Sequence, residues 1–133
     1  MLGIETFLIN CIVQPGRQGA RLVAEIDLTS RVERIEAFEE RVGVRFQGMS
    51  AFLDADDDYI SLRVHGEIHA STGAELSDDV AVVIAVYDQS DRVVGTDTSY
   101  YYSESFFGFE VFSEALSLSV KNISKIRVYP KRG

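Results

Sequence analysis

The segment from 80 to 97, VAVVIAVYDQSDRVVGTD, constrains the fold more than any other part of the chain. It contains a long apolar run, a short polar turn and a second apolar run that soon reaches a glycine. Two apolar runs joined in this way are typical of a β-hairpin in a packed sheet. Short alternating runs separated by turn residues surround it. We therefore predict a mainly-β protein, an immunoglobulin-like antiparallel β-sandwich of about seven to nine strands.

The length of 133 residues fits a single domain over 1–133. Turn residues at 15–19 and 54–58 and a loop at 71–79 separate the predicted strands. These strands are Thr6–Val13, Ala20–Leu28, a run from Val44 continued by Ser50–Leu53, Tyr59–His69, Val80–Tyr87, Arg92–Thr98, Phe106–Phe112 and Ile123–Tyr129.

Residues 30–42 depart from the period of two that a strand shows. Their apolar residues recur at helical spacing, Ser30 and Glu33 have the spacing of a capping box, and Gly43 follows as a stop signal. This pattern predicts one short amphipathic helix over 30–42, and two further strands are the alternative.

The strand at 80–87 is apolar on both faces, since Val80, Val82, Ile84 and Val86 alternate with Ala81, Val83, Ala85 and Tyr87. A strand with one wet face would alternate with polar residues. We therefore predict a central strand that is covered on both sides. The sandwich core covers one face, and either the predicted helix or a second copy of the protein covers the other, which makes a homodimer one hypothesis.

Three motifs of the chain resemble a known family. They are Gly66-Glu67-Ile68, AVYDQSDRVVGT at 85–96 and FGFEV at 107–111. Together they look like the small bacterial immunoglobulin-like sandwiches called FxLYD domains, over about residues 60–129. Asp91 departs from the pattern, because the family often has glycine there. The resemblance implies an adhesive or accessory module, often extracellular, and it brings no catalytic residues.

The charge balance argues against nucleic acid as a partner. The formal net charge is -8, whereas nucleic-acid binding needs a basic surface. The C-terminal end is an exception, because Lys121, Lys125, Arg127, Lys131 and Arg132 occur there without an acid. A solvated last strand and a small docking surface for an acidic partner are the two interpretations of this basic end.

The chain also lacks the marks of membrane insertion and export. No apolar run approaches the roughly 20 residues of a membrane helix, and no signal peptide is recognisable. The single cysteine, Cys11, lies in an apolar stretch and is expected to be a buried, inert thiol. We therefore expect a cytoplasmic protein with no membrane partner.

Aromatic residues are densest between 100 and 109. In a strand about half of them must point inward, and the outward members would form a recognition surface, because tyrosine is favoured at interfaces. The predicted interaction surface consists of Tyr100, Tyr101, Tyr102 and Phe107. The partner would be another protein or a second copy of this one.

An acidic turn offers a second hypothesis. Asp54, Asp56 and Asp58 lie in the DADDD turn, and Ca²⁺ prefers such carboxylate oxygens on loops. The turn lacks the glycine and glutamate of an EF-hand, and a solvated turn explains it equally well. The segment HGEIH at 65–69 reads as a strand, where two histidines four residues apart lie about 13 Å from each other and cannot share one zinc ion.

No catalytic signature occurs in the chain: there is no G-x-S-x-G elbow, phosphate-binding loop or dinucleotide fingerprint. The sequence therefore predicts a non-catalytic protein-interaction or accessory module that needs no cofactor. The alternative is a Ca²⁺-dependent binding module that uses the acidic turn.

Overall fold

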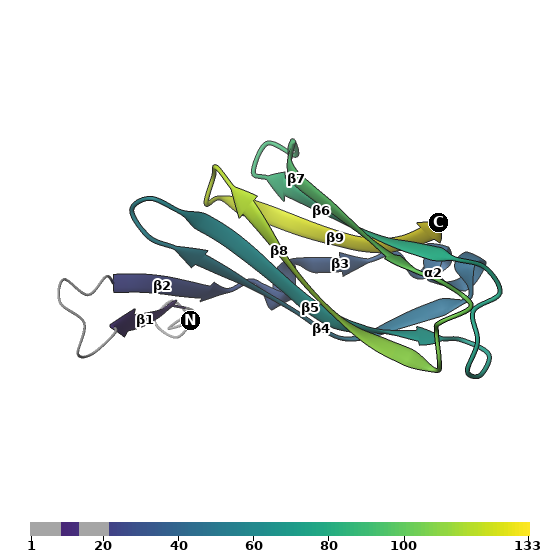
Figure 1. The fold of residues 1–133 in the computed structure, drawn as a ribbon. Coiled ribbons are helices and arrows are strands. Elements are labelled where there is room, and N and C mark those ends of the chain that lie inside the picture. The colour runs from purple at the N-terminus through teal and green to yellow at the C-terminus, as the bar shows by residue number, and fades with distance from the viewer. Residues whose placement is uncertain (1–8, 14–21) are drawn as a thin grey trace.

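The computed structural model describes residues 9–13 and 22–133, which form two facing β-sheets (Figure 1). The first sheet has the strand order β1-β2-β4-β5-β8, and the second has the order β3-β9-β6-β7. All hydrogen-bonded neighbours are antiparallel except β3 and β9, which run parallel. The predicted β-sandwich is thus confirmed, with nine strands in the described part of the chain.

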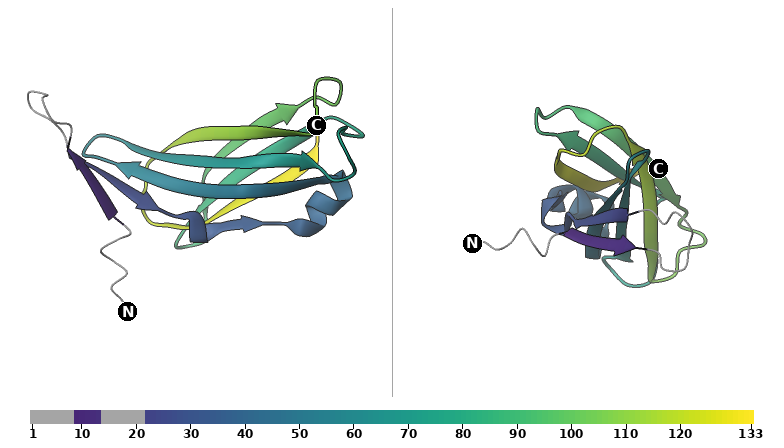
Figure 2. Two further views of the ribbon diagram at one scale, coloured as in Figure 1. Left: turned by 90° about the horizontal axis from the view of Figure 1, so that it is seen from below. Right: turned by 90° about the vertical axis from the view of Figure 1, so that its left-hand side faces the viewer.

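Two short helices precede β4, and two further views show them beside the sheets (Figure 2). The helices are the 3-10 helix η1 (Thr29–Arg31) and the α-helix α2 (Glu36–Val42). The strands of the first sheet are β1 (Ile9–Val13), β2 (Leu22–Asp27), β4 (Val44–Ala55), β5 (Ile60–Ala70) and β8 (Phe109–Leu118). Those of the second sheet are β3 (Val32–Arg34), β9 (Ile123–Arg132), β6 (Val80–Asp88) and β7 (Val93–Tyr101).

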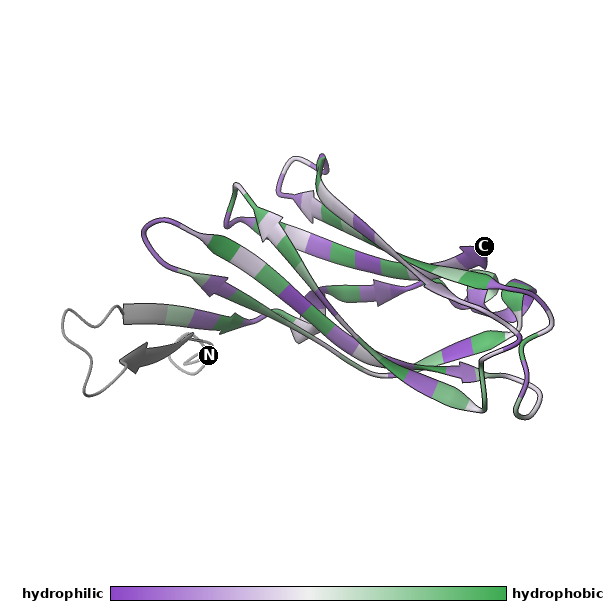
Figure 3. Cartoon of the chain, in the orientation of Figure 1, coloured by the Kyte–Doolittle hydropathy of each residue, from purple (hydrophilic) through white to green (hydrophobic). Residues whose placement is uncertain are grey.

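The hydrophobic core lies between the two sheets. Successive side chains of a strand point to opposite faces, so every second residue faces inward. Hydrophobic and hydrophilic bands accordingly alternate along β5 and β9 (Figure 3). Phe46 and Val64 from the first sheet and Ile84 and Ile126 from the second are fully buried. Each such side chain stabilises the fold by roughly 1.5–3 kcal/mol, so this layer holds the sheets together.

Strand β6 lies between β9 and β7 and is buried on both faces, as predicted. On its outer face Ala81 and Ala85 are small, and the register places them beside larger side chains of the same sheet, Tyr100 and Arg127. Helix α2 packs against β9 and β4. The monomer therefore buries this face with its own side chains, which removes the reason for predicting a dimer across it.

The prediction of one helix over 30–42 is wrong in its N-terminal half. The segment forms η1, then β3, and only then α2. Strand β3 pairs with Ile126–Val128 of β9, so the hydrogen bonds of a sheet edge override the helical spacing. The predicted capping box is absent, since Ile35 is the N-cap residue and has no capping side chain.

The C-terminal half of that prediction is confirmed. Helix α2 ends at Gly43, which has a φ of 86° and donates its N–H to the carbonyl of Glu39. Glycine adopts this left-handed conformation without the steric cost that a side chain brings.

Other predicted bounds shift by a few residues or fall outside the described part. Strand β8 begins at Phe109 and continues to Leu118, whereas Phe106 is buried in the preceding loop. The predicted turn at 15–19 lies outside the described residues, as does the side chain of Cys11 within β1. Among the described helices, none has the length and apolar character that crossing a bilayer requires.

Candidate functional site

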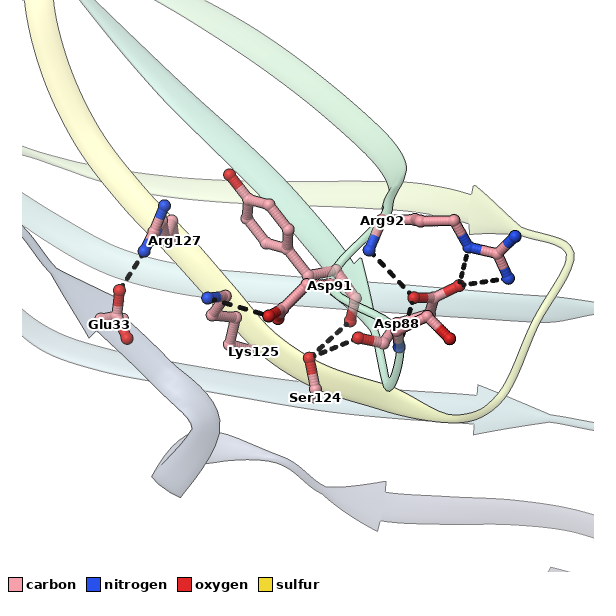
Figure 4. A network of polar contacts seen from close by, with 9 residues as sticks. Glu33, Asp88, Asp91, Arg92, Ser124, Lys125 and Arg127 are labelled. Atoms are coloured by element: carbon pink, nitrogen blue, oxygen red, sulfur yellow. Dashed lines mark hydrogen bonds and ion pairs between the residues drawn. The ribbon is translucent and has the colours of Figure 1, made fainter.

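The turn between β6 and β7, residues 88–92, is held by a single buried carboxylate (Figure 4). Asp88 accepts hydrogen bonds from the backbone N–H groups of Ser90, at 2.8 Å, and Arg92, at 3.0 Å. These bonds, above all the one from Arg92, lower the pKa of Asp88 although burial opposes the shift. A carboxylate that binds its own turn in this way is a structural element.

The side chains around this turn are also engaged with one another (Figure 4). The cationic groups of Lys125 and Arg127 lie 5.0 and 5.2 Å from the centre of the Tyr87 ring. Lys125 also pairs with Asp91 at 3.5 Å, and Arg127 donates to Glu33 of β3 at 2.7 Å. The network ties three strands together and leaves its charged groups paired, so we assign it to stability.

Two glycines in the motifs that resemble FxLYD domains are also explained by packing. A Cβ added to Gly66 would lie 2.5 Å from the sulfur of Met49 and 2.8 Å from the ring of Phe112. A Cβ at Gly95 would lie 2.7 Å from Leu118. Core side chains occupy the space above both backbones, so the motifs at 66–68 and 85–96 describe packing and turn chemistry.

The aromatic segment, by contrast, exposes large apolar side chains. Phe107, Phe109 and Val111 are 84%, 50% and 67% exposed, and we call these three residues the apolar row. They follow every second position into β8, so the two within the strand share its outer face. Tyr100 and Tyr102 are 58% and 55% exposed.

The predicted surface needs one correction. Tyr101 is only 9% exposed and belongs to the core cluster, because alternation in β7 turns it inward between its two exposed neighbours. The structure thus keeps Tyr100, Tyr102 and Phe107 as surface residues and excludes Tyr101. The structure adds Phe109 and Val111 to this surface. A strand predicted to begin at 109 would have identified both residues from the alternation in the FGFEV motif.

Strand β8 is an edge strand of the first sheet, with β5 as its one strand neighbour in the described residues. Phe109 stacks on His69 of β5 with ring centres 4.9 Å apart and an interplanar angle of 10°. This histidine is held in turn by Glu67, at 2.8 Å. Strand β5 therefore supports the ring of Phe109 from one side, while the apolar row remains exposed to solvent.

Acidic residues line the inner side of the same region. Ser99 of β7 donates to Glu114 of β8 at 2.7 Å, which joins the edges of the two sheets. Burial, together with hydrogen-bonded Asp97, holds the pKa of Glu114 above its usual value against the opposing effect of Ser99. Burial and the nearby carboxylates of Glu114 and Glu110 raise the pKa of Tyr101 to about 12. We call Asp97, Ser99 and Glu114 the acidic seam.

The structure does not bring the three residues of the predicted calcium site, Asp54, Asp56 and Asp58, into one metal-binding cluster. Asp54 lies on the outer face of β4, where its carboxylate accepts from Arg63 at 2.7 Å. Asp56 lies in the turn and accepts from the backbone N–H of Asp58 at 2.9 Å. In the part of the chain that the structure describes, no three His, Cys, Asp or Glu side chains are grouped for metal binding.

The histidines of the HGEIH segment form the expected row on a strand face. His65 contacts the hydroxyl of Ser113 at 2.9 Å, and His69 contacts Glu67. Each has its own partner on the outer face of the first sheet, in keeping with a structural role.

Comparison with known proteins adds no relative. No family model matches the chain, and neither a curated protein nor a solved structure shows significant similarity to it. The resemblance to FxLYD domains therefore stays a prediction that rests on the residues named above.

Proposed function

We propose that this protein is a non-catalytic protein-interaction module whose apolar row binds a partner. The observation that carries the proposal is the exposure of Phe107, Phe109 and Val111 at the start of one edge strand and in the loop just before it. Exposed apolar side chains that gather at one place, instead of being scattered, mark interaction sites on soluble proteins. Aromatic side chains in particular contribute large contact areas to interfaces.

The edge position suggests how the partner binds. An edge strand offers unpaired backbone groups to which an extended peptide can add as a further strand. Proteins commonly protect such edges with lysine or proline, and β8, FEVFSEALSL, contains neither residue. Backbone hydrogen bonds to β8 would provide affinity, and the apolar row would select apolar side chains at alternate positions of the partner. That partner is a strand of another protein or of a second copy.

A peptide selection tests this proposal. Random peptides displayed on phage would be enriched on the native protein and on a variant with Phe107, Phe109 and Val111 replaced by serine. We expect the native protein to enrich peptides with apolar residues at every second position, and the variant to lose that enrichment. Light scattering of the native protein at high micromolar concentration shows whether a second copy takes the same place.

The chain provides a matched control. Tyr59 and Val93 are each 54% exposed and lie outside the apolar row. A variant with serine at both positions removes exposed apolar surface elsewhere on the molecule and should enrich the same peptides as the native protein. Equal enrichment on all three proteins, or none on any, contradicts the proposal.

A further inference from the structure

A second surface of the molecule, far from the apolar row in sequence, combines cations with an apolar floor. It is a hollow of about 330 Å³ between α2 and the C-terminal end of β9, which lie beside each other in Figure 1. We call it the basic hollow, and six residues line it: Phe38, Arg41, Val42, Pro130, Lys131 and Arg132. Its volume is at the lower end of the range of about 300–1,000 Å³ that small-ligand sites occupy.

The shape of the hollow is set by rigid elements. Phe38, Arg41 and Val42 are three and four residues apart on α2, so they lie on one helix face. The ring of Phe38 packs edge-on against Tyr129 of β9, with centroids 5.8 Å apart and an interplanar angle of 77°. This contact positions the helix face against the strand, while Phe38 remains 38% exposed toward the hollow.

A buried carboxylate fixes the helix itself. Glu39 is 2% exposed and accepts from the guanidinium of Arg34 at 2.7 and 3.0 Å and from the backbone N–H of Phe46 at 3.1 Å. These bonds connect α2 to β3 and β4. Phe38, Arg41 and Val42 are therefore presented by a helix that cannot rotate without breaking these bonds.

The cations of the hollow form no ion pair with any acidic residue that the structure describes. Arg34, Arg63 and Arg127 each bind a carboxylate. Within the described residues, by contrast, no ion pair engages Arg41, Lys131 or Arg132, and no acidic residue lines the hollow. In a chain with a net charge of -8, three cations around one apolar hollow, with no ion pair to residues 9–13 or 22–133, are an unusual concentration of positive charge.

We propose that the basic hollow binds a small organic anion whose apolar body contacts Phe38, Val42 and Pro130. Its carboxylate or phosphate group would be bound by Arg41, Lys131 and Arg132. Guanidinium groups suit this task because their donors match the geometry of carboxylate and phosphate. The site is separate from the apolar row and does not depend on the proposed protein partner.

An NMR titration of the full ¹⁵N-labelled chain tests the proposal with three probes. They are 3-phenylpropanoate, its neutral analogue 3-phenylpropan-1-ol, and acetate, which has the charge without the apolar body. We expect 3-phenylpropanoate to shift amide signals of residues 38–42 and of residues 131 and 132, and to bind about tenfold more tightly than either of the others. A phenyl phosphate titration then shows whether phosphate is preferred to carboxylate.

Paired variants connect the binding to these cations. The double variant Arg41→Gln and Lys131→Gln should lose at least about tenfold in affinity. Arg41 lies in the last turn of α2, where its positive charge also stabilises the helix by interacting with the C-terminal carbonyl groups. The single variant Lys131→Gln therefore measures the loss of affinity without changing the helix. The control is Arg45→Gln with Lys121→Gln, which removes the same charge from cations that line no part of the hollow.

The control variant should bind as the native protein does. Three results would overturn the proposal. The first is an absence of shifts at about 10 mM probe, a concentration that would nearly saturate a site with a millimolar Kd. The others are equal binding of the acid and the alcohol, and an equal loss of affinity in the hollow variant and the control variant.

Discussion

The two ends of strand β7 differ in whether the side chains there are paired with one another or exposed to solvent. At its start, the turn at 88–92 has a buried aspartate, paired charges and a tyrosine flanked by two cations. At its end, the connection to β8 exposes Tyr102 and Phe107 to solvent. Groups that satisfy one another contribute to folding and are not available to a partner. The comparison teaches that the densest sequence motif and the exposed aromatic side chains lie at opposite ends of one strand.

The largest effect is expected within the three consecutive tyrosines. Tyr101→Ala should lower the free energy of unfolding by about 3 kcal/mol, because it empties a buried site. Tyr100→Ser and Tyr102→Ser should each stay within about 0.5 kcal/mol of the native protein. Urea denaturation of the three variants measures this. Similar losses in all three would mean that the exposed tyrosines also support the fold.

Substitutions that disturb the inner face of β8 should destabilise the protein, whereas substitution of the exposed Val111 on its outer face should not. Gly66→Ala places a methyl group against the ring of Phe112, which is itself buried, and should destabilise the protein by about 1–3 kcal/mol. Met49 is flexible and can move aside, so the aromatic ring sets the cost. Thermal unfolding of this variant beside the exposed exchange Val111→Ser provides the measurement, and a stable Gly66→Ala would contradict the packing argument.

The acidic seam predicts a pH dependence of stability. The pKa of Glu114 is raised above 4.5 in the folded protein, so the folded state holds this proton more tightly than the unfolded chain does. Stability is therefore lost as the pH rises from 4.5 through the raised pKa. Glu114→Gln keeps an acceptor for Ser99 and removes the charge, and should raise the melting temperature at pH 7.

The gain from Glu114→Gln should vanish as the pH falls below 4.5, where the native glutamic acid is neutral in both states. Melting temperatures of both proteins between pH 4 and pH 8 test this window. Glu104→Gln, at an exposed residue of the neighbouring loop, is the control. A gain that persists unchanged at pH 4 would mean that the charge of Glu114 is not its cause.

A smaller effect tests the turn at 88–92. Asp91 has a φ of 61°, a left-handed conformation that costs an ordinary residue about 1–2 kcal/mol relative to glycine. Asp91→Gly and Asp91→Ala both remove the exposed ion pair with Lys125. The glycine variant should therefore be the more stable of the two by about 1 kcal/mol, as measured by urea denaturation. An equal stability would show that the backbone of this turn is relaxed.

The smallest effects on stability are expected at the two most exposed residues of the apolar row. Serine at Phe107 or Val111 should each change the free energy of unfolding by less than about 0.5 kcal/mol, because these side chains are already largely in water. Serine at Phe109 should cost about 0.5–1.5 kcal/mol, because this half-exposed ring stacks on His69. Peptide binding should nevertheless be lost. A strong destabilisation at these positions would return the row to the core and erase the contrast between the two ends of β7.

The local sequence pattern was sufficient to predict secondary structure in segments where a single hydrophobic period is clear. The alternation of 44–47, the two-sided apolar strand at 80–87 and the stop at Gly43 are found as predicted, and the strand predicted at 59–69 is found one residue later, at 60–70. It failed at 32–34, whose helical spacing gave way to pairing with a strand more than ninety residues later. It also failed at Tyr101, where a shift of one residue reverses the face.

The sequence by itself determined that this protein is a β-sandwich with a buried central strand at 80–87, because alternation and turn chemistry are local properties. Only the tertiary structure decided which side chains satisfy one another and which are left over. The apolar row lies at a sheet edge, the acidic seam joins the edges of the two sheets, and the basic hollow lies between α2 and the end of β9. Their character depends on strand order and on the path of α2, and neither can be obtained from neighbouring residues alone.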